Sequence, residues 1–128
     1  MHLDHIIVNV NDAAESLAFY EAVLGFVPDG MDGPFSVLRV EEGFTMLLAP
    51  WGTKGGGHFA FAMDAATFDA TFARLREKSI PFGDSYHVVG NGKGPGLELG
   101  AKGMGEAVYF FDPNKHLLEI RTYDRKTA

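Results

Sequence analysis

The order of hydrophobic and polar positions predicts a strand and then an amphipathic helix at the start of the chain. Residues 3–10 are rich in β-branched side chains, which is typical of a strand. Leu17, Tyr20 and Leu24 then recur at i, i+3 and i+7, the spacing of one helix face, and Gly25 follows as a stop. Short strands are expected near 26–30, 35–40 and 44–49. The first unit therefore has the predicted order βαβββ.

The same order of elements returns after the glycine-rich run at 54–57. A strand is expected over 58–63, and Asp64 can cap the second helix. Further strands are expected near 82–88, 96–100, 105–111 and 117–123. We interpret the chain as a duplicated unit, with a first βαβββ module over 1–54 and a second over 55–128. Together they predict a single α+β domain.

Strand parity places three metal-binding side chains on the faces that point away from the helices. His5 lies opposite the apolar set of the first strand, His58 opposite that of the strand after the glycines, and Glu119 opposite that of the last strand. Two imidazoles and one carboxylate suit a divalent iron, manganese, cobalt, nickel or zinc ion. Each residue alone has an ordinary explanation, such as a Glu119–Arg121 ion pair, but agreement across three strands favours a metal site.

Composition excludes several other classes of protein. The 128 residues contain no cysteine, which removes disulfides, thiolate nucleophiles and thiolate zinc sites. Eleven basic and 17 acidic residues give a net charge of −6 without a long basic run, so no nucleic-acid partner is expected. No run approaches the ~18 apolar residues of a membrane span, and the start does not look like a signal peptide. We expect a cytoplasmic protein with no membrane partner.

At this point the sequence resembles a known family, the vicinal oxygen chelate superfamily. The resemblance rests on the repeated unit, on its opening residues His5 and His58, and on the segment YFFDPNKHLLE from Tyr109 to Glu119. The family includes glyoxalase I, extradiol dioxygenases, fosfomycin-resistance thiol transferases and bleomycin-resistance proteins. The resemblance implies two βαβββ modules with curled mixed sheets enclosing a cavity, and a homodimer. It also implies one divalent metal ion per site on His5, His58 and Glu119, with Fe2+ favoured and Mn2+, Ni2+, Co2+ or Zn2+ as alternatives.

The ligand set favours the dioxygenase-like branch of this family. Glyoxalase I-like members add a fourth ligand on the last strand of the first unit, where Met46 takes the matching position here. We therefore expect a metal-dependent oxidoreductase that acts on a catecholic or other vicinal-oxygen substrate. Two alternatives stay open: a thiol transferase or lyase on the same site, and a metal-free binding protein like the bleomycin-resistance proteins.

The other candidate site residues define a small-molecule pocket. Tyr109 is expected to hydrogen-bond the substrate, although a core tyrosine is the structural alternative, and His87 is a candidate acid–base catalyst. His116 is expected to face solvent. The predicted pocket is apolar with one cation, which favours an aromatic or hydrophobic substrate over a phosphonate. Its residues are Ile7, Met46, Phe111 and Arg121.

Overall fold

The computed structural model describes residues 1–125 and confirms the α+β class. The last three residues of the predicted second module, 126–128, lie outside the described residues. The chain divides into two compact units, one from Met1 to Lys54 and one that begins at Gly55. Within residues 1–125, no helix has the length and apolar character that crossing a bilayer requires.

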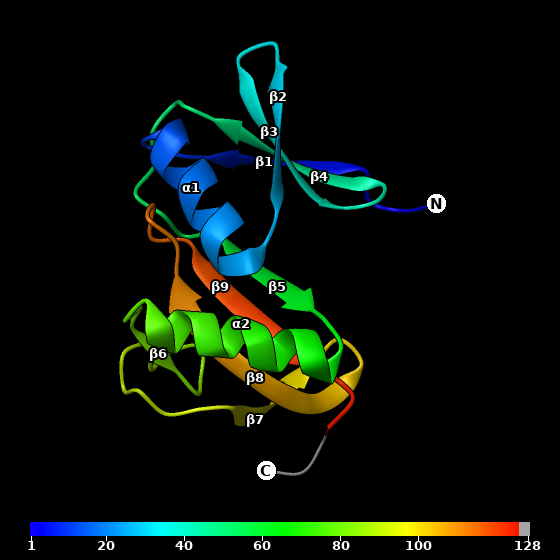
Figure 1. Cartoon of the computed structure of the whole chain (residues 1–128), viewed down its shortest axis with the longest axis vertical. Helices are drawn as coiled ribbons and strands as arrows, with labels where there is room; N and C mark the ends of the chain where they lie inside the picture. The colour runs from blue at the N-terminus through cyan, green and yellow to red at the C-terminus, as the bar shows by residue number, and fades with distance from the viewer. Residues whose placement is uncertain (126–128) are drawn as a thin grey trace. The chain divides into compact units, whose positions relative to one another are not determined.

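The first unit is a four-stranded mixed sheet with one helix (Figure 1). The strand order is β1-β4-β3-β2, in which β1 runs parallel to β4 and the other neighbours are antiparallel. The elements are β1 (His5–Asn9), α1 (Ala13–Leu24), β2 (Val27–Asp32), β3 (Phe35–Glu41) and β4 (Phe44–Ala49).

Local sequence signals explain where α1 begins and ends. The Asp12 side chain accepts a hydrogen bond from the Glu15 backbone N–H at 3.0 Å, which caps the first turn. Gly25 ends the helix in the left-handed conformation that glycine adopts without steric cost. The helix buries Tyr20 and Val23, and the sheet contributes Leu38, Met46 and Leu48 to the same core, with Val10 just after β1.

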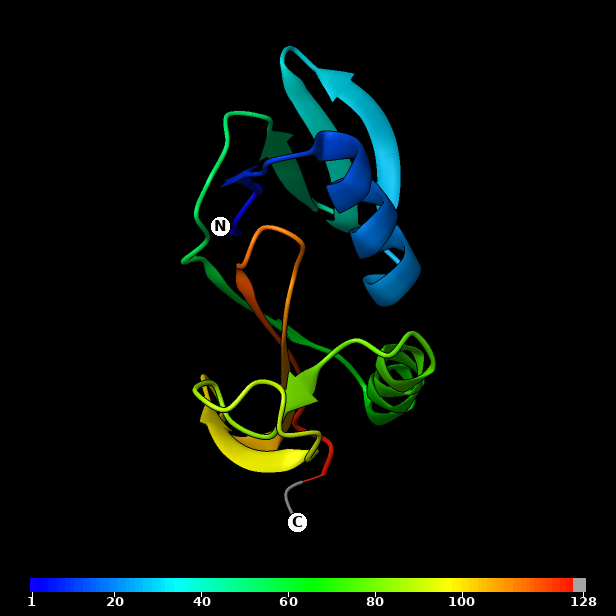
Figure 2. The ribbon, with the colours of Figure 1, turned by 90° about the vertical axis from the view of Figure 1, so that its left-hand side faces the viewer.

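The second unit places one helix against a five-stranded sheet of order β5-β9-β8-β6, with β7 also paired to β8. Figure 2 shows the helix of this unit nearly end-on, beside the strands. Phe68 and Leu75 of the helix pack with Phe110, Leu118 and Ile120, all of them fully buried. The elements are β5 (His58–Ala62), α2 (Ala65–Glu77), β6 (Phe82–Gly83), β7 (Gly96–Gly100), β8 (Gly103–Phe111) and β9 (Leu117–Thr122).

The strand predicted over 82–88 is much shorter than expected. Only Phe82–Gly83 pairs with β8, and the chain then folds back so that the backbone N–H groups of Gly90 and Gly92 donate to the Phe82 carbonyl. A Cβ at Gly83 would lie 1.9 Å from the Val88 carbonyl oxygen. This close backbone approach turns the expected strand into a loop.

The turn between β8 and β9 is a buried polar structure. Asp112 accepts hydrogen bonds from the backbone N–H groups of Asn114 and His116, at 2.8 and 2.9 Å. His116 Nδ1 accepts from the Gly57 N–H at 3.0 Å. His116 is only 5% exposed, so the prediction that it faces solvent is wrong. Its ring anchors the segment that enters β5, and this holds the start of that strand beside β9.

Candidate active site

The second unit brings together two of the three predicted metal ligands. In the parallel β5–β9 pair, Ala60 lies opposite Glu119, so His58 and Glu119 project from the same sheet face. His58 Nε2 and Glu119 Oε1 lie 3.1 Å apart. The Glu119 side chain is buried, whereas that of His58 is half exposed. The pair therefore presents a nitrogen and an oxygen donor at a surface that a small molecule can reach.

An open cavity of about 510 Å3 borders this pair. Ala60 and Ala62 follow His58 on the same face of β5, and their small side chains leave space in the cavity. The turn from Leu99 to Lys102 and the ring of Tyr123 form further parts of the wall. The volume suits a small organic molecule rather than a macromolecule.

The second oxygen of Glu119 is already bound. Arg121, only 2% exposed, donates from Nη1 to Glu119 Oε2 at 2.6 Å and from Nη2 to the Glu98 carbonyl at 2.8 Å. The two oxygens of the Glu119 carboxylate thus have different partners: Oε2 contacts Arg121 and Oε1 faces His58.

Tyr109 lies directly opposite Glu119 in the β8–β9 pair, and its ring centroid is 6.5 Å from that of His58. Burial, together with the negative charges of Glu119 and Glu98, raises the pKa of Tyr109 to about 12. Its phenol therefore keeps its proton at neutral pH, which makes it a hydrogen-bond donor beside the pair.

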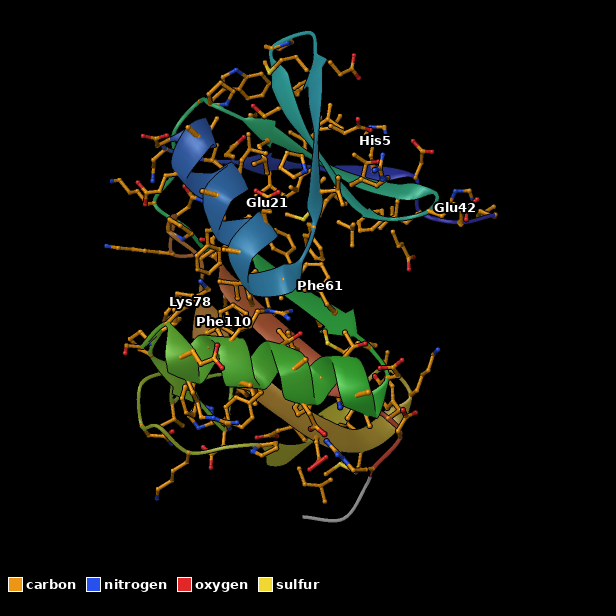
Figure 3. All side chains as sticks on the ribbon, in the orientation of Figure 1. His5, Glu21, Glu42, Phe61, Lys78 and Phe110 are labelled. Carbon is orange, nitrogen blue, oxygen red and sulfur yellow. The ribbon has the colours of Figure 1, made fainter. Side chains whose placement is uncertain are left out.

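His5 lies in the first unit, where it projects from β1 (Figure 3). Its Nδ1 lies 2.8 Å from Asp4 Oδ2, and this hydrogen bond holds the pKa of Asp4 below its ordinary value. When one ring nitrogen of a histidine is hydrogen-bonded to a carboxylate, the other ring nitrogen can bind a metal ion. Metal-bound histidines commonly have such a hydrogen-bond partner. His5 also borders a cavity of about 460 Å3.

The cavity at His5 is mainly apolar. Ile7 is half exposed and follows His5 on the same face of β1, and Thr45 and Leu47 face it from β4. Phe35 closes another side and makes an edge contact with Trp51, at 5.5 Å between ring centroids. Ile7 thus borders this cavity of the first unit, and its place in the substrate pocket stays a prediction.

The donor pair fits a divalent metal ion. Two ligands that bind one ion at about 2.0–2.2 Å and near right or tetrahedral angles lie roughly 3–3.5 Å apart. The 3.1 Å between His58 Nε2 and Glu119 Oε1 falls in this range. Among residues 1–125, no three His, Cys, Asp or Glu side chains gather into one group that could hold a metal ion. The third ligand, His5, therefore stays a prediction.

Comparison with known proteins identifies the family. The model of the Glyoxalase/Bleomycin resistance protein/Dioxygenase superfamily matches residues 2–120. The chain belongs to this superfamily. The family expected from the sequence is thus confirmed.

Solved structures agree with this assignment and include enzymes. The structure titled Oxidase ChaP-H2 is 29% identical with a TM-score of 0.81, covering 99% of this chain and 97% of that one. Oxidase ChaP-H1 is 28% identical with a TM-score of 0.77, covering 95% of each chain. A lactoylglutathione lyase from Agrobacterium tumefaciens, 20% identical with a TM-score of 0.68 over 95% and 93% of the two chains, shows the shared fold.

Met46 does not take the position expected for a pocket residue in this superfamily. It is fully buried and lies opposite Ile6 and Leu38, which places it in the core below the sheet. The β4 side chains that share the face of His5 are Thr45 and Leu47, so the prediction for Met46 is corrected. Neither Thr45 nor Leu47 carries a carboxylate or an imidazole.

Two further candidates lie away from the cavity at His58. Phe111 shares the sheet face of Tyr109 and is 47% exposed, but it does not line the cavity. His87 lies in the loop after β6, where its Nδ1 is 3.1 Å from Ser85 Oγ and its ring packs on Tyr86. The structure gives His87 no place in the cavity wall.

Sequence reasoning missed two contributors to the site. Asp4 precedes His5, and the pairing of a carboxylate with a neighbouring histidine could have been noticed in the sequence. The Glu98 main-chain carbonyl, which accepts from Arg121, has no sequence signal because any residue supplies such a group.

Proposed function

We propose that this protein is a metal-dependent enzyme that oxidises a small catecholic or other vicinal-oxygen substrate, in the manner of an extradiol dioxygenase. His58, Glu119 and, as third ligand, His5 would hold one divalent ion, with Fe2+ favoured. The observation that carries the proposal is the pair of donor atoms 3.1 Å apart at the wall of an open cavity. Similarity to two structures titled as oxidases, at 28% and 29% identity, supports oxidation over thiol transfer.

A bound divalent ion supplies Lewis-acid polarisation and open coordination positions for two adjacent substrate oxygens. The chain supplies the remaining functions. His58 and Glu119 offer lone pairs from a rigid sheet, which holds the donors in one geometry. Tyr109 keeps a phenolic proton that it can donate to a substrate oxygen beside the pair.

The cavity wall supports a flat apolar substrate. Ala60 and Ala62 have small side chains, so the cavity above β5 has room for a planar ring. Leu99 and the Tyr123 ring add apolar surface to the cavity wall. Burial of such a ring against these side chains favours binding through the hydrophobic effect.

The first test is the metal content of the protein purified without oxygen or chelators. We expect near-stoichiometric iron in the wild type and loss of the metal in His58→Ala. The control is His2→Ala, which removes an exposed histidine outside the site and should keep the iron. Circular dichroism of each variant verifies folding. If the wild type binds none of Fe2+, Mn2+ and Zn2+ when these are added, the proposal is overturned in favour of a metal-free binding protein.

The second test is oxygen uptake by the Fe2+-loaded protein with a panel of catechols. We expect uptake with at least one member of the panel and none with His58→Ala. Metal-loaded protein that consumes no oxygen but forms an adduct with glutathione would contradict the oxidase assignment and indicate a transferase.

A further inference from the structure

Arg121 is predicted from the sequence to line the substrate pocket, and it borders the cavity at His58, where its guanidinium contacts Glu119. The two residues are neighbours on one face of β9, with Nη1 2.6 Å from Glu119 Oε2. Both side chains are almost completely buried, at 3% and 7% exposure. A buried ion pair of this length is strong and directional because little water competes for either group.

The guanidinium is held on several sides. Nη2 donates to the Glu98 carbonyl of β7 at 2.8 Å, and Cζ lies 4.8 Å from the centre of the Tyr123 ring. Gly100 passes so close that a Cβ there would lie 2.3 Å from Arg121 Cζ. These contacts come from different parts of the second unit, so the side chain has one available position.

One atom of the arginine indicates what fixes this position. Nε is buried and has no hydrogen-bond partner within the part of the chain that the structure describes. An unsatisfied buried donor is unfavourable. The guanidinium therefore keeps its place because of its bonds to Glu119 and Glu98, not because each of its donors is satisfied.

We propose that Arg121 is a positioning residue that makes Glu119 a one-oxygen metal ligand. Arg121 occupies Oε2, and only Oε1 remains on the side of His58. A carboxylate can bind an ion through one oxygen or through both. By excluding the two-oxygen mode, Arg121 keeps a coordination position free for substrate. The inference rests on the proposed function, since it concerns the same metal site.

The test uses Co2+ as a spectroscopic probe of the full-length protein. Visible absorption of Co2+ becomes weaker as its coordination number rises, so it reports whether Glu119 binds through one oxygen or two. In Arg121→Met the carboxylate is free to use both oxygens, and we expect the absorption per bound ion to fall by about twofold, since geometry and ligand number determine the spectrum.

Three further variants distinguish positioning from a general structural effect. Arg121→Lys keeps the charge but lacks the two-armed fork that reaches both Glu119 and Glu98, so it should restore the wild-type spectrum only in part. Gly100→Ala displaces the guanidinium without removing it and should shift the spectrum in the same direction. Arg125→Met is the matched control. It removes an arginine that pairs with Asp69 and Glu106, away from the cavity, and should leave the spectrum unchanged.

The outcomes separate the two proposals. If the wild type binds Co2+ and every folded variant at positions 121 and 100 keeps the wild-type spectrum, the role of Arg121 is overturned while the metal site stands. If Arg121→Met does not fold, Arg121→Lys and Gly100→Ala decide the question. If the wild type binds no Co2+, the proposed function fails and the role of Arg121 falls with it.

Discussion

At the scale of single residues, Glu119 and Arg121 depend on each other for charge balance. Their bond joins two side chains that are largely removed from water. Separating such a pair by changing one partner leaves an uncompensated buried charge, whereas removing both charges can cost little. The pair is thus important for stability even without a metal ion.

We predict that Glu119→Gln lowers the free energy of unfolding by about 3–5 kcal/mol. The double variant Glu119→Gln/Arg121→Met should recover part of that loss, because no unpaired guanidinium remains. Urea unfolding in the presence of EDTA measures both values. His58→Ala is the control, since its half-exposed ring should contribute far less. An equal loss in the single and double variants would contradict the argument.

The sequence could predict that His58 and Glu119 share a sheet face, because strand parity depends only on the order of residues along a strand. It failed for Met46, because the face on which a β4 side chain lies depends on the register between β4 and β1. It failed for His116 because a turn residue has no parity, and its burial comes from Asp112 and Gly57. Register and turn contacts are tertiary properties.

At the scale of the elements, α2 contributes buried side chains to the core of the second unit. Phe68 is fully buried against the sheet, and Phe110, labelled in Figure 3, faces the same core. We predict that Phe68→Ala lowers the free energy of unfolding by about 3–5 kcal/mol through lost burial and a residual cavity. Phe111→Ala, at a 47% exposed position, should lower it much less. Urea unfolding measures both free energies, and an equal decrease in Phe68→Ala and Phe111→Ala would contradict the prediction.

The start of α2 gives a prediction about pH. Hydrogen bonds from Thr67 lower the pKa of Asp64, the capping carboxylate. A lowered pKa in the folded state means that the charged cap stabilises the protein above the unfolded value of 3.8, and that this contribution is lost as the pH falls through the folded value. Asp64→Asn keeps a capping side chain but carries no charge.

We therefore expect the wild type to melt at a higher temperature than Asp64→Asn at neutral pH. The difference should narrow as the pH falls to about 2. Thermal unfolding followed by circular dichroism at a series of pH values measures it. A difference that stays constant over this range would exclude a charge contribution from Asp64.

Both helices could be predicted to within a few residues because their caps, Asp12 and Asp64, and the stop at Gly25 are local signals. The strand over 82–88 could not be predicted. Its composition resembles a strand, but Gly83 lets the chain fold back onto itself and the expected pairing ends after two residues. The contact that ends this strand forms within the segment itself, between Gly83 and Val88, and strand-forming composition gives no sign of it.

At the scale of the whole molecule, the acidic chain of 13.9 kDa exposes several large apolar side chains. Leu3, Ile7 and Met31 of the first unit are at least half exposed. Exposed apolar surface of this kind favours association. We predict a homodimer, as the family resemblance implies, with a solution mass twice that of the chain. Light scattering at micromolar concentration measures it, and the mass of a single chain would contradict the prediction.

The contact of Trp51 with Phe35 has a practical consequence. Trp51 is the one tryptophan in the sequence, and its partner ring forms part of the cavity wall at His5. All indole emission of the protein therefore originates one side chain away from that cavity. A molecule or a paramagnetic ion that arrives there should change the intensity or the wavelength of this emission. Unlabelled protein thus carries its own optical reporter of occupancy.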